Sequence, residues 1–293
     1  MGPAMSGPSS PRFVLLGLLI CFFFSGAAGL IYQVAWGKAL GLIFGHTAYA
    51  IATVLAVFMG GLAAGSAWLG RSSDDKTRPV ALYGWIEMGV AASGTLSLAG
   101  LAGVRAAYVA AYAYAAGHVA GLLALRFTGA ALVLFVPTFL MGGTLPVLVR
   151  GLTRNSAELG ARLARLYWVN TAGAVAGALA AGFVLLPRLG LRQTLGVAVG
   201  LNVLAGALAL RLARHETASI AAATTPPAPR QSSAPALPPR FLLVCFAVVG
   251  ATAMAYEIGW TRLLATQLGS STYAFTLMLA TFLAGIVIGS AIF

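Results

Sequence analysis

The stretch SGAAGLIYQVAWGKALGLIFGHTAYAIATVLAVFMGGLAAGS, residues 25–66, decides the fold because it occurs twice. Its second copy, VGATAMAYEIGWTRLLATQLGSSTYAFTLMLATFLAGIVIGS, lies 224 positions later at residues 249–290. Over residues 18–67 this shift gives 19 identities in 50 positions without a gap. Each copy contains two long apolar runs, so the repeat predicts a duplicated membrane unit. Because the second copy is internal, the N-terminal run is interpreted as a membrane span and not as a signal peptide.

The composition agrees with a membrane protein. Hydrophobic residues make up 60% of the chain and charged residues only 8%, and the mean hydropathy is +0.92. Soluble domains carry about 25% charged residues. The net charge is +12, but the basic residues stand a few at a time at the ends of apolar runs, so no nucleic-acid partner is expected. The two cysteines lie in apolar runs and the three histidines stand apart, so neither a disulfide framework nor a metal or cofactor site is predicted.

Apolar runs of about 20 residues can cross a membrane. The sequence predicts eight of them, at 13–34, 47–69, 80–103, 127–149, 166–187, 191–210, 241–260 and 272–293. A further run, 106–125, is long enough to cross but only weakly hydrophobic, with many alanines and three tyrosines. That composition favours a helix at the outer membrane interface.

The distribution of basic residues favours one topology. If 106–125 does not cross and the N-terminus is cytoplasmic, 12 basic residues lie inside and 6 outside; if 106–125 crosses, the counts become 8 and 10. Basic residues concentrate on the cytoplasmic side of membrane proteins, which favours the first arrangement. Six spans then separate the two copies, so both copies point the same way through the membrane.

The predicted fold is therefore an all-α polytopic membrane protein, built as a major-facilitator-like parallel repeat of six-helix halves. A cytoplasmic N-terminus (1–12) precedes a complete first half (13–211). The segment 212–239, rich in Pro, Ala, Ser and Thr, is expected to be a cytoplasmic linker. Residues 240–293 begin a second half that stops after two spans, so the chain is expected to be a fragment.

Small residues at four-residue spacing predict close contacts between helices. They occur as the pairs Gly61/Gly65, Gly173/Gly177 and Gly285/Gly289. Asn170, a lone amide in an apolar run, is expected to hold helices together. Pro137 and Pro146 lie within one span and are expected to kink it.

Two carboxylates lie inside predicted spans, Glu87 and Glu257. A charge in the bilayer is costly, so each is a candidate site residue. Glu257 has a simpler explanation as a structural ion pair with Arg262, about one helical turn away. The first copy has Gln33 and Lys38 at these two positions, so a site formed by the two copies is not symmetric.

Aromatic side chains accompany these polar positions in both copies. The repeat aligns Tyr32 and Trp36 with Tyr256 and Trp260, near the outer ends of their spans. Aromatic belts at the membrane interface explain that placement, and stacking against a ligand is the alternative. The substrate-binding candidates are therefore Glu87, Glu257, Tyr256, Trp260, Gln33 and Trp36; no catalytic residue is predicted.

Four stretches carry a resemblance to a known family: residues 25–66, PTFLMGGTLPVL (137–148), LYWVNTAGAVAGALAAGFVLLPRLG (166–190) and AYEIGWTRLLATQLGSSTYAFTLMLATFLAGIVIGS (255–290). Together they resemble the membrane part of bacterial membrane-fused spermidine-synthase-like proteins. This resemblance implies a multi-pass inner-membrane domain followed by a cytoplasmic aminopropyltransferase-type domain. That domain, with its co-substrate decarboxylated S-adenosylmethionine, is absent from these residues.

Three functions are consistent with the sequence. The first is a membrane domain that anchors a cytoplasmic aminopropyltransferase-like domain and passes or senses its cationic substrate or product. Glu87 and Glu257 are then the expected polyamine-binding groups. The second is a facilitator-type secondary transporter without an enzymatic partner. The third is a purely structural membrane scaffold, with Glu257 and Arg262 as a local ion pair.

Overall fold

The computed structural model describes residues 11–72, 78–115, 117–152, 156–214, 238–269 and 271–292. Every regular element in these ranges is a helix: α1 (Pro11–Phe44), α2 (Ala48–Ser72), α3 (Pro79–Ala115), α4 (Val119–Leu152), α5 (Ser156–Leu179), the π-helix η1 (Ala180–Leu185), α6 (Leu186–Leu212), α8 (Pro239–Leu268) and α9 (Ser271–Ile292). The predicted N-terminal segment and linker fall largely on residues 1–10 and 215–237, outside the described residues.

Seven helical stretches of the described chain are long and apolar enough to cross a membrane, so the protein is a multi-pass membrane protein. One of them, Leu163–Leu212, has 50 residues and joins α5, η1 and α6. Such a helix would measure about 75 Å, more than twice the hydrocarbon thickness of about 30 Å. The helix is interrupted at Gly190, where φ is 72° and ψ is −179°. The break lies between the predicted spans 166–187 and 191–210, which explains why eight predicted spans correspond to seven stretches.

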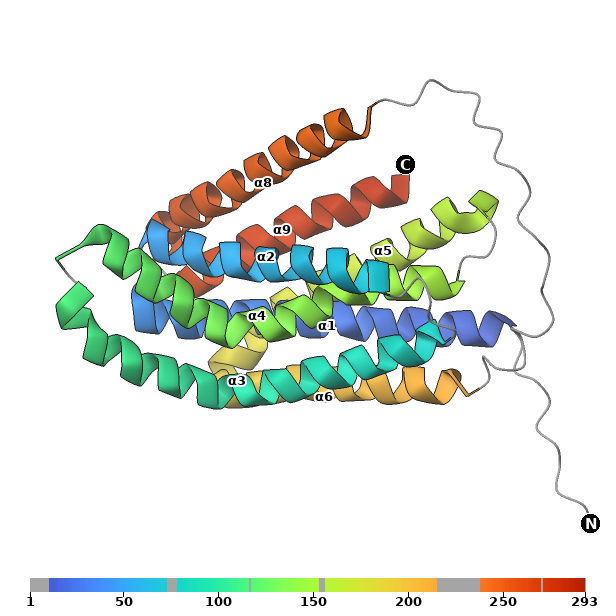
Figure 1. Cartoon of the computed structure of the whole chain (residues 1–293), viewed down its shortest axis with the longest axis horizontal. Helices are drawn as coiled ribbons and strands as arrows, with labels where there is room; N and C mark the ends of the chain where they lie inside the picture. Colours follow the sequence, from blue (N-terminus) through green and yellow to red (C-terminus); the bar gives the residue numbers. More distant parts are fainter. Residues whose placement is uncertain are drawn as a thin grey trace, which may run out of the picture.

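Successive helices run up and down along one long axis (Figure 1). In that view α1 and α8 run in the same direction, and α2 and α9 return in the opposite direction. The turns after α1 and α8 each contain a glycine with positive φ, Gly45 (83°) and Gly269 (65°), and these glycines are equivalent in the repeat. The two copies therefore form the same local structure, a helical hairpin closed at a left-handed glycine. The arrangement into two parallel six-helix halves stays a prediction.

Helix α1 occupies the centre of the bundle. It packs against α5 and α6 and touches α2, α3, α4 and α9. Its buried side chains include Leu18, Phe22, Tyr32, Trp36 and Leu40, each 0–1% exposed. Helix α8, in contrast, packs mainly against α9 and touches α2 at the edge of the bundle.

Small residues explain the closest helix pairs, as predicted for two of the three glycine pairs. A Cβ added to Gly173 or Gly177 of α5 would collide with the α1 backbone, and one added to Gly65 of α2 would collide with the α4 backbone. Asn170 Nδ2 donates a hydrogen bond to the carbonyl oxygen of Phe22 at 3.0 Å, which confirms its role between helices. The predicted contact at Gly285/Gly289 is wrong, because nothing lies within 4 Å of a Cβ at either position.

The segment 106–125 is not a separate interfacial helix. Residues up to Ala115 extend α3, and residues from Val119 begin α4. Helix α3 has 37 residues, about 55 Å, so part of this hairpin extends beyond a hydrocarbon layer of about 30 Å. The segment is weakly hydrophobic because it forms the ends of α3 and α4 that extend beyond the hydrocarbon layer, not because it forms a separate helix along the membrane surface. Helix α4 continues through Pro137 and Pro146 and curves along its length (Figure 1).

Candidate functional site

Glu87 lies in α3 and is fully buried, with 0% of its surface exposed. It faces α6, where Asn202 Nδ2 donates a hydrogen bond to Glu87 Oε2 at 2.5 Å. The helices approach closely here because both carry glycines: a Cβ on Gly206 would lie 2.9 Å from the carbonyl oxygen of Gly84. Gly84 and Gly206 lie about one turn from Glu87 and Asn202 and let α3 and α6 approach closely. This close approach brings the carboxylate and the amide within hydrogen-bonding distance.

Further polar groups surround the Glu87 carboxyl. Tyr83, one turn earlier on α3, and Ser25 of α1 lie beside the Glu87 carboxyl. Tyr32 of α1 is close enough to interact with it electrostatically. Four oxygens of this cluster are buried without a hydrogen-bond partner: Tyr32 Oη, Tyr83 Oη, Glu87 Oε1 and Asn202 Oδ1. We call these residues the Glu87 cluster. Buried polar atoms normally have partners, so an open carboxylate oxygen beside three further open oxygens marks a group of acceptors that lacks a donor.

Trp36 closes one side of this region and is not an interfacial anchor. It is fully buried and stacks on Tyr32, with ring centroids 4.6 Å apart and an interplanar angle of 18°. Its Nε1 donates a hydrogen bond to Ser97 Oγ at 2.9 Å. The Tyr32 ring fits against Gly94, where a Cβ would lie 2.7 Å from Cζ. The interfacial assignment is wrong for Trp36, because α1 lies at the centre of the bundle.

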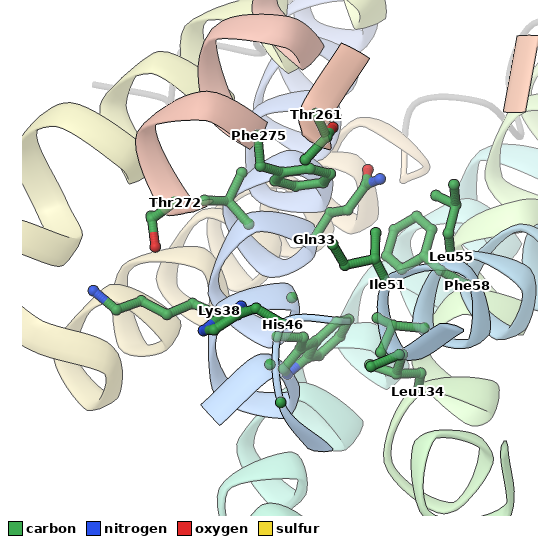
Figure 2. A pocket seen from close by; sticks show the side chains of 17 residues that line it. Gln33, Lys38, His46, Ile51, Leu55, Phe58, Leu134, Thr261, Thr272 and Phe275 are labelled. Atoms are coloured by element: carbon green, nitrogen blue, oxygen red, sulfur yellow. The ribbon is translucent and has the colours of Figure 1, made fainter. Parts of the chain in front are cut away.

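A second site lies between the two copies of the repeat. A cavity of about 70 Å³ is bounded by α1 and α2 of the first copy, by α8 and α9 of the second copy and by Leu134 of α4. Equivalent positions of the two copies both contribute to its lining: Gly37 and Thr261, and Ile51 and Phe275. We call this space the hairpin cavity; Figure 2 shows the side chains that line it.

Gln33 supplies one polar group of the hairpin cavity and Thr261 another. They are 6% and 2% exposed, and neither Gln33 Nε2 nor Thr261 Oγ1 has a hydrogen-bond partner. In Figure 2 they gather with Phe275 at one end of the cavity, and His46 lies at the other end. Trp36 and Lys38 also contribute to the lining.

The remaining candidates on α8 are less enclosed. Tyr256 and Trp260 are 60% and 52% exposed. Glu257 is half-buried, and its Oε1 is buried without a partner. The Arg262 side chain is exposed, and no ion pair between it and Glu257 is seen among the described residues, so the structural pair stays a prediction.

The two acids are not brought together. Glu87 lies in α3, which packs against α4, α6 and α1, whereas Glu257 lies in α8 at the opposite edge. The two candidate acids therefore belong to different parts of the bundle, and the structure gives them no shared site. Within the described residues, no three His, Cys, Asp or Glu side chains gather to hold a metal.

Asn202, Tyr83 and Thr261 were not identified from the sequence. Asn202 is a lone amide in an apolar run, the same signal that identified Asn170. Tyr83 lies one turn before Glu87, and Thr261 one turn after Glu257, so helical spacing from each acid would have found both.

No protein-family model, no curated protein and no solved structure matches this chain.

Proposed function

We propose that this membrane protein binds a small cationic solute, an alkylamine or polyamine, at the Glu87 cluster. The observation that carries the proposal is the carboxylate of Glu87, fully buried in the helix bundle and beside open oxygens from three helices. An intramembrane carboxylate is costly, and such residues mark substrate and ion pathways.

The chemistry of the cluster suits an ammonium group. An ammonium donates three hydrogen bonds and accepts none. Glu87 Oε1, Asn202 Oδ1 and the tyrosine hydroxyls can all accept, and each is without a partner. The positive charge would also pair the buried carboxylate, which is otherwise unfavourable in a low-dielectric interior. The stacked rings of Tyr32 and Trp36 add faces that attract cations.

The resemblance to membrane-fused spermidine-synthase-like proteins gives this site a biological setting. The chain would be the inner-membrane domain that anchors a cytoplasmic aminopropyltransferase-type domain and receives its polyamine substrate or product. Its N-terminus would be cytoplasmic, at the end of the bundle that carries most basic residues. Glu257 would not belong to this site, because α8 and α3 lie apart.

Thermal unfolding of the full chain in lipid nanodiscs tests the proposal. We expect 1,4-diaminobutane and spermidine to raise the unfolding temperature, because a ligand that binds the folded state stabilises it. The uncharged isostere 1,4-butanediol should have no effect at constant sodium concentration. Glu87→Gln keeps the shape and removes the charge, so it should abolish the diamine shift.

Glu257→Gln is the matched control, since it neutralises the other intramembrane acid and should retain the shift. A diamine shift that survives in Glu87→Gln, in protein with an unchanged circular dichroism spectrum, would overturn the proposal. If neither variant alters folding or diamine response and the wild type shows no shift, the scaffold function is supported instead.

A facilitator-type transporter is the second proposed function. It is favoured by the hairpin cavity, because the two sequence copies contribute equivalent positions to its walls. Transporters commonly bind substrate between repeats. Uptake of labelled solute into proteoliposomes, lost when Gln33 or Thr261 of this cavity is replaced, would support transport. Diamine binding at Glu87 without uptake of any solute would support the anchoring domain.

A further inference from the structure

The hairpin cavity differs in chemistry from the Glu87 cluster. Its 17 lining residues include Lys38 and no carboxylate. Its two buried, unpartnered polar atoms are the amide nitrogen of Gln33 and the hydroxyl of Thr261. The cavity thus offers an amide donor, a hydroxyl that can donate and a cationic side chain, whereas the Glu87 cluster contains a carboxylate.

We propose that the hairpin cavity binds a small carboxylate with an apolar body. This goes beyond the amine site proposed at Glu87 and does not depend on it. The polar end of the cavity would hold the carboxylate, and the aliphatic and aromatic wall would hold the hydrocarbon part.

The donors at the polar end carry the first part of the argument. Gln33 is 6% exposed and Thr261 is 2% exposed, so water outside the bundle does not satisfy them. A buried donor without a partner is unfavourable, and a carboxylate accepts up to four hydrogen bonds. One carboxylate placed between α1 and α8 would satisfy both donors.

The charge of the cavity lining is the second argument for a carboxylate ligand. Lys38 supplies the only formal charge, and it is half-buried. Its side chain lines the cavity and extends toward Thr272 (Figure 2). The Lys38 ammonium points away from Gln33 and Thr261 (Figure 2), but it is a cation in the same cavity wall. Its charge favours an anion over an amine, because a second cation would be repelled.

The apolar wall of the cavity is the third argument, and it concerns the hydrocarbon part of the ligand. Most other lining side chains are apolar, with Val34, Leu55, Phe58, Leu134 and Phe275 among them. They match a hydrocarbon body, and the volume of about 70 Å³ restricts it to a short one. A free inorganic anion would leave this wall without a partner.

Calorimetric titration of the full chain in zwitterionic lipid nanodiscs provides the test. The probes are butanoate and hexanoate, with butylamine and 1-butanol as matched compounds of similar size. We expect saturable carboxylate binding, with the amine and the alcohol at least tenfold weaker. Empty nanodiscs measure partition into lipid.

Thr261→Val and Gln33→Leu remove the donors and nearly conserve side-chain volume. Each should weaken butanoate binding by roughly tenfold to a hundredfold, the effect of losing one hydrogen bond to a charged group. Thr252→Val is the matched control on the same helix, since the Thr252 side chain is exposed and bonds to the carbonyl oxygen of Val248 at 2.9 Å. Lys38→Met should remove the preference for butanoate over 1-butanol.

Several results would overturn the proposal. Equal affinity for 1-butanol and butanoate would make the cavity merely apolar. Binding equal to that of empty nanodiscs, or unchanged in both Thr261→Val and Gln33→Leu, would place the ligand elsewhere. Glu87→Gln should abolish the diamine effect and leave butanoate binding unchanged. The carboxylate site and the amine site can therefore fail independently of each other.

Discussion

The first and second copies of the repeated segment differ most in what surrounds them. Tyr32 and Trp36 of the first copy are fully buried and stacked on each other. Their equivalents, Tyr256 and Trp260, are 60% and 52% exposed. The local structure is the same, a long helix ending at a left-handed glycine, but α1 lies at the centre of the bundle and α8 at its edge. Identical residues thus acquire opposite roles through their neighbours alone.

The glycines repeat this contrast. Cβ atoms added at Gly26, Gly61 or Gly65 of the first copy would collide with atoms of α5 or α4. At the equivalent positions Gly250, Gly285 and Gly289, nothing lies within 4 Å. Small residues therefore permit close packing without enforcing it, because a second helix must also be present.

Replacing the buried tryptophan should have the largest effect. Trp36→Ala removes the stack on Tyr32 and leaves Ser97 without its donor, so it should lower the free energy of unfolding by about 3–5 kcal/mol. Trp260→Ala should change it by less than about 0.5 kcal/mol, as at exposed positions generally. Denaturant titration in detergent micelles measures both variants. Equal losses would mean that the two copies have equivalent surroundings.

Filling a packed glycine comes next. Gly65→Ala should lower stability by about 1–3 kcal/mol, because its Cβ would collide with the carbonyl group of Phe139 and α2 and α4 would have to separate. Gly60→Ala, on the same helix with nothing within 4 Å, is the control and should not destabilise the protein. If Gly60→Ala also lowers stability, the loss would come from placing alanine in α2 and not from the contact with α4.

The two turn glycines should respond alike. Gly45→Ala and Gly269→Ala place a side chain at positive φ and should each cost about 1 kcal/mol, because L-residues disfavour this conformation. Gly29→Ala, within a helix and with open space, is the comparison. A cost at only one turn would show that the two hairpins differ locally as well as in their surroundings.

The smallest effect has the opposite sign. Gly250→Ala should raise stability by about 0.4–1 kcal/mol, because alanine favours the helix and meets no atom within 4 Å. Its equivalent in the first copy, Gly26→Ala, should lower stability, since its Cβ would collide with the carbonyl group of Asn170. A loss of stability in Gly250→Ala would mean that α8 is packed against a partner in the membrane.

Hydropathy and spacing located most of the helical framework. The apolar runs predicted the membrane helices, the glycine pairs of α2 and α5 predicted two close contacts, and Asn170 predicted a link between helices. These features are local, since they depend on residues within a few turns of one another. The segment 106–125 was misassigned because weak hydrophobicity is common to interfacial helices and to helix ends that extend beyond the hydrocarbon layer.

The sequence by itself determined that this chain is a helical membrane protein with a repeated hairpin, because length, hydropathy and glycine positions are properties of single segments. Only the tertiary structure decided that Trp36 is buried and Trp260 exposed, that Asn202 meets Glu87, and that Gln33 and Thr261 line one cavity. Those contacts join residues more than 100 positions apart, or depend on where a helix lies in the bundle. Periodicity along one helix carries no information about which other helix lies beside it.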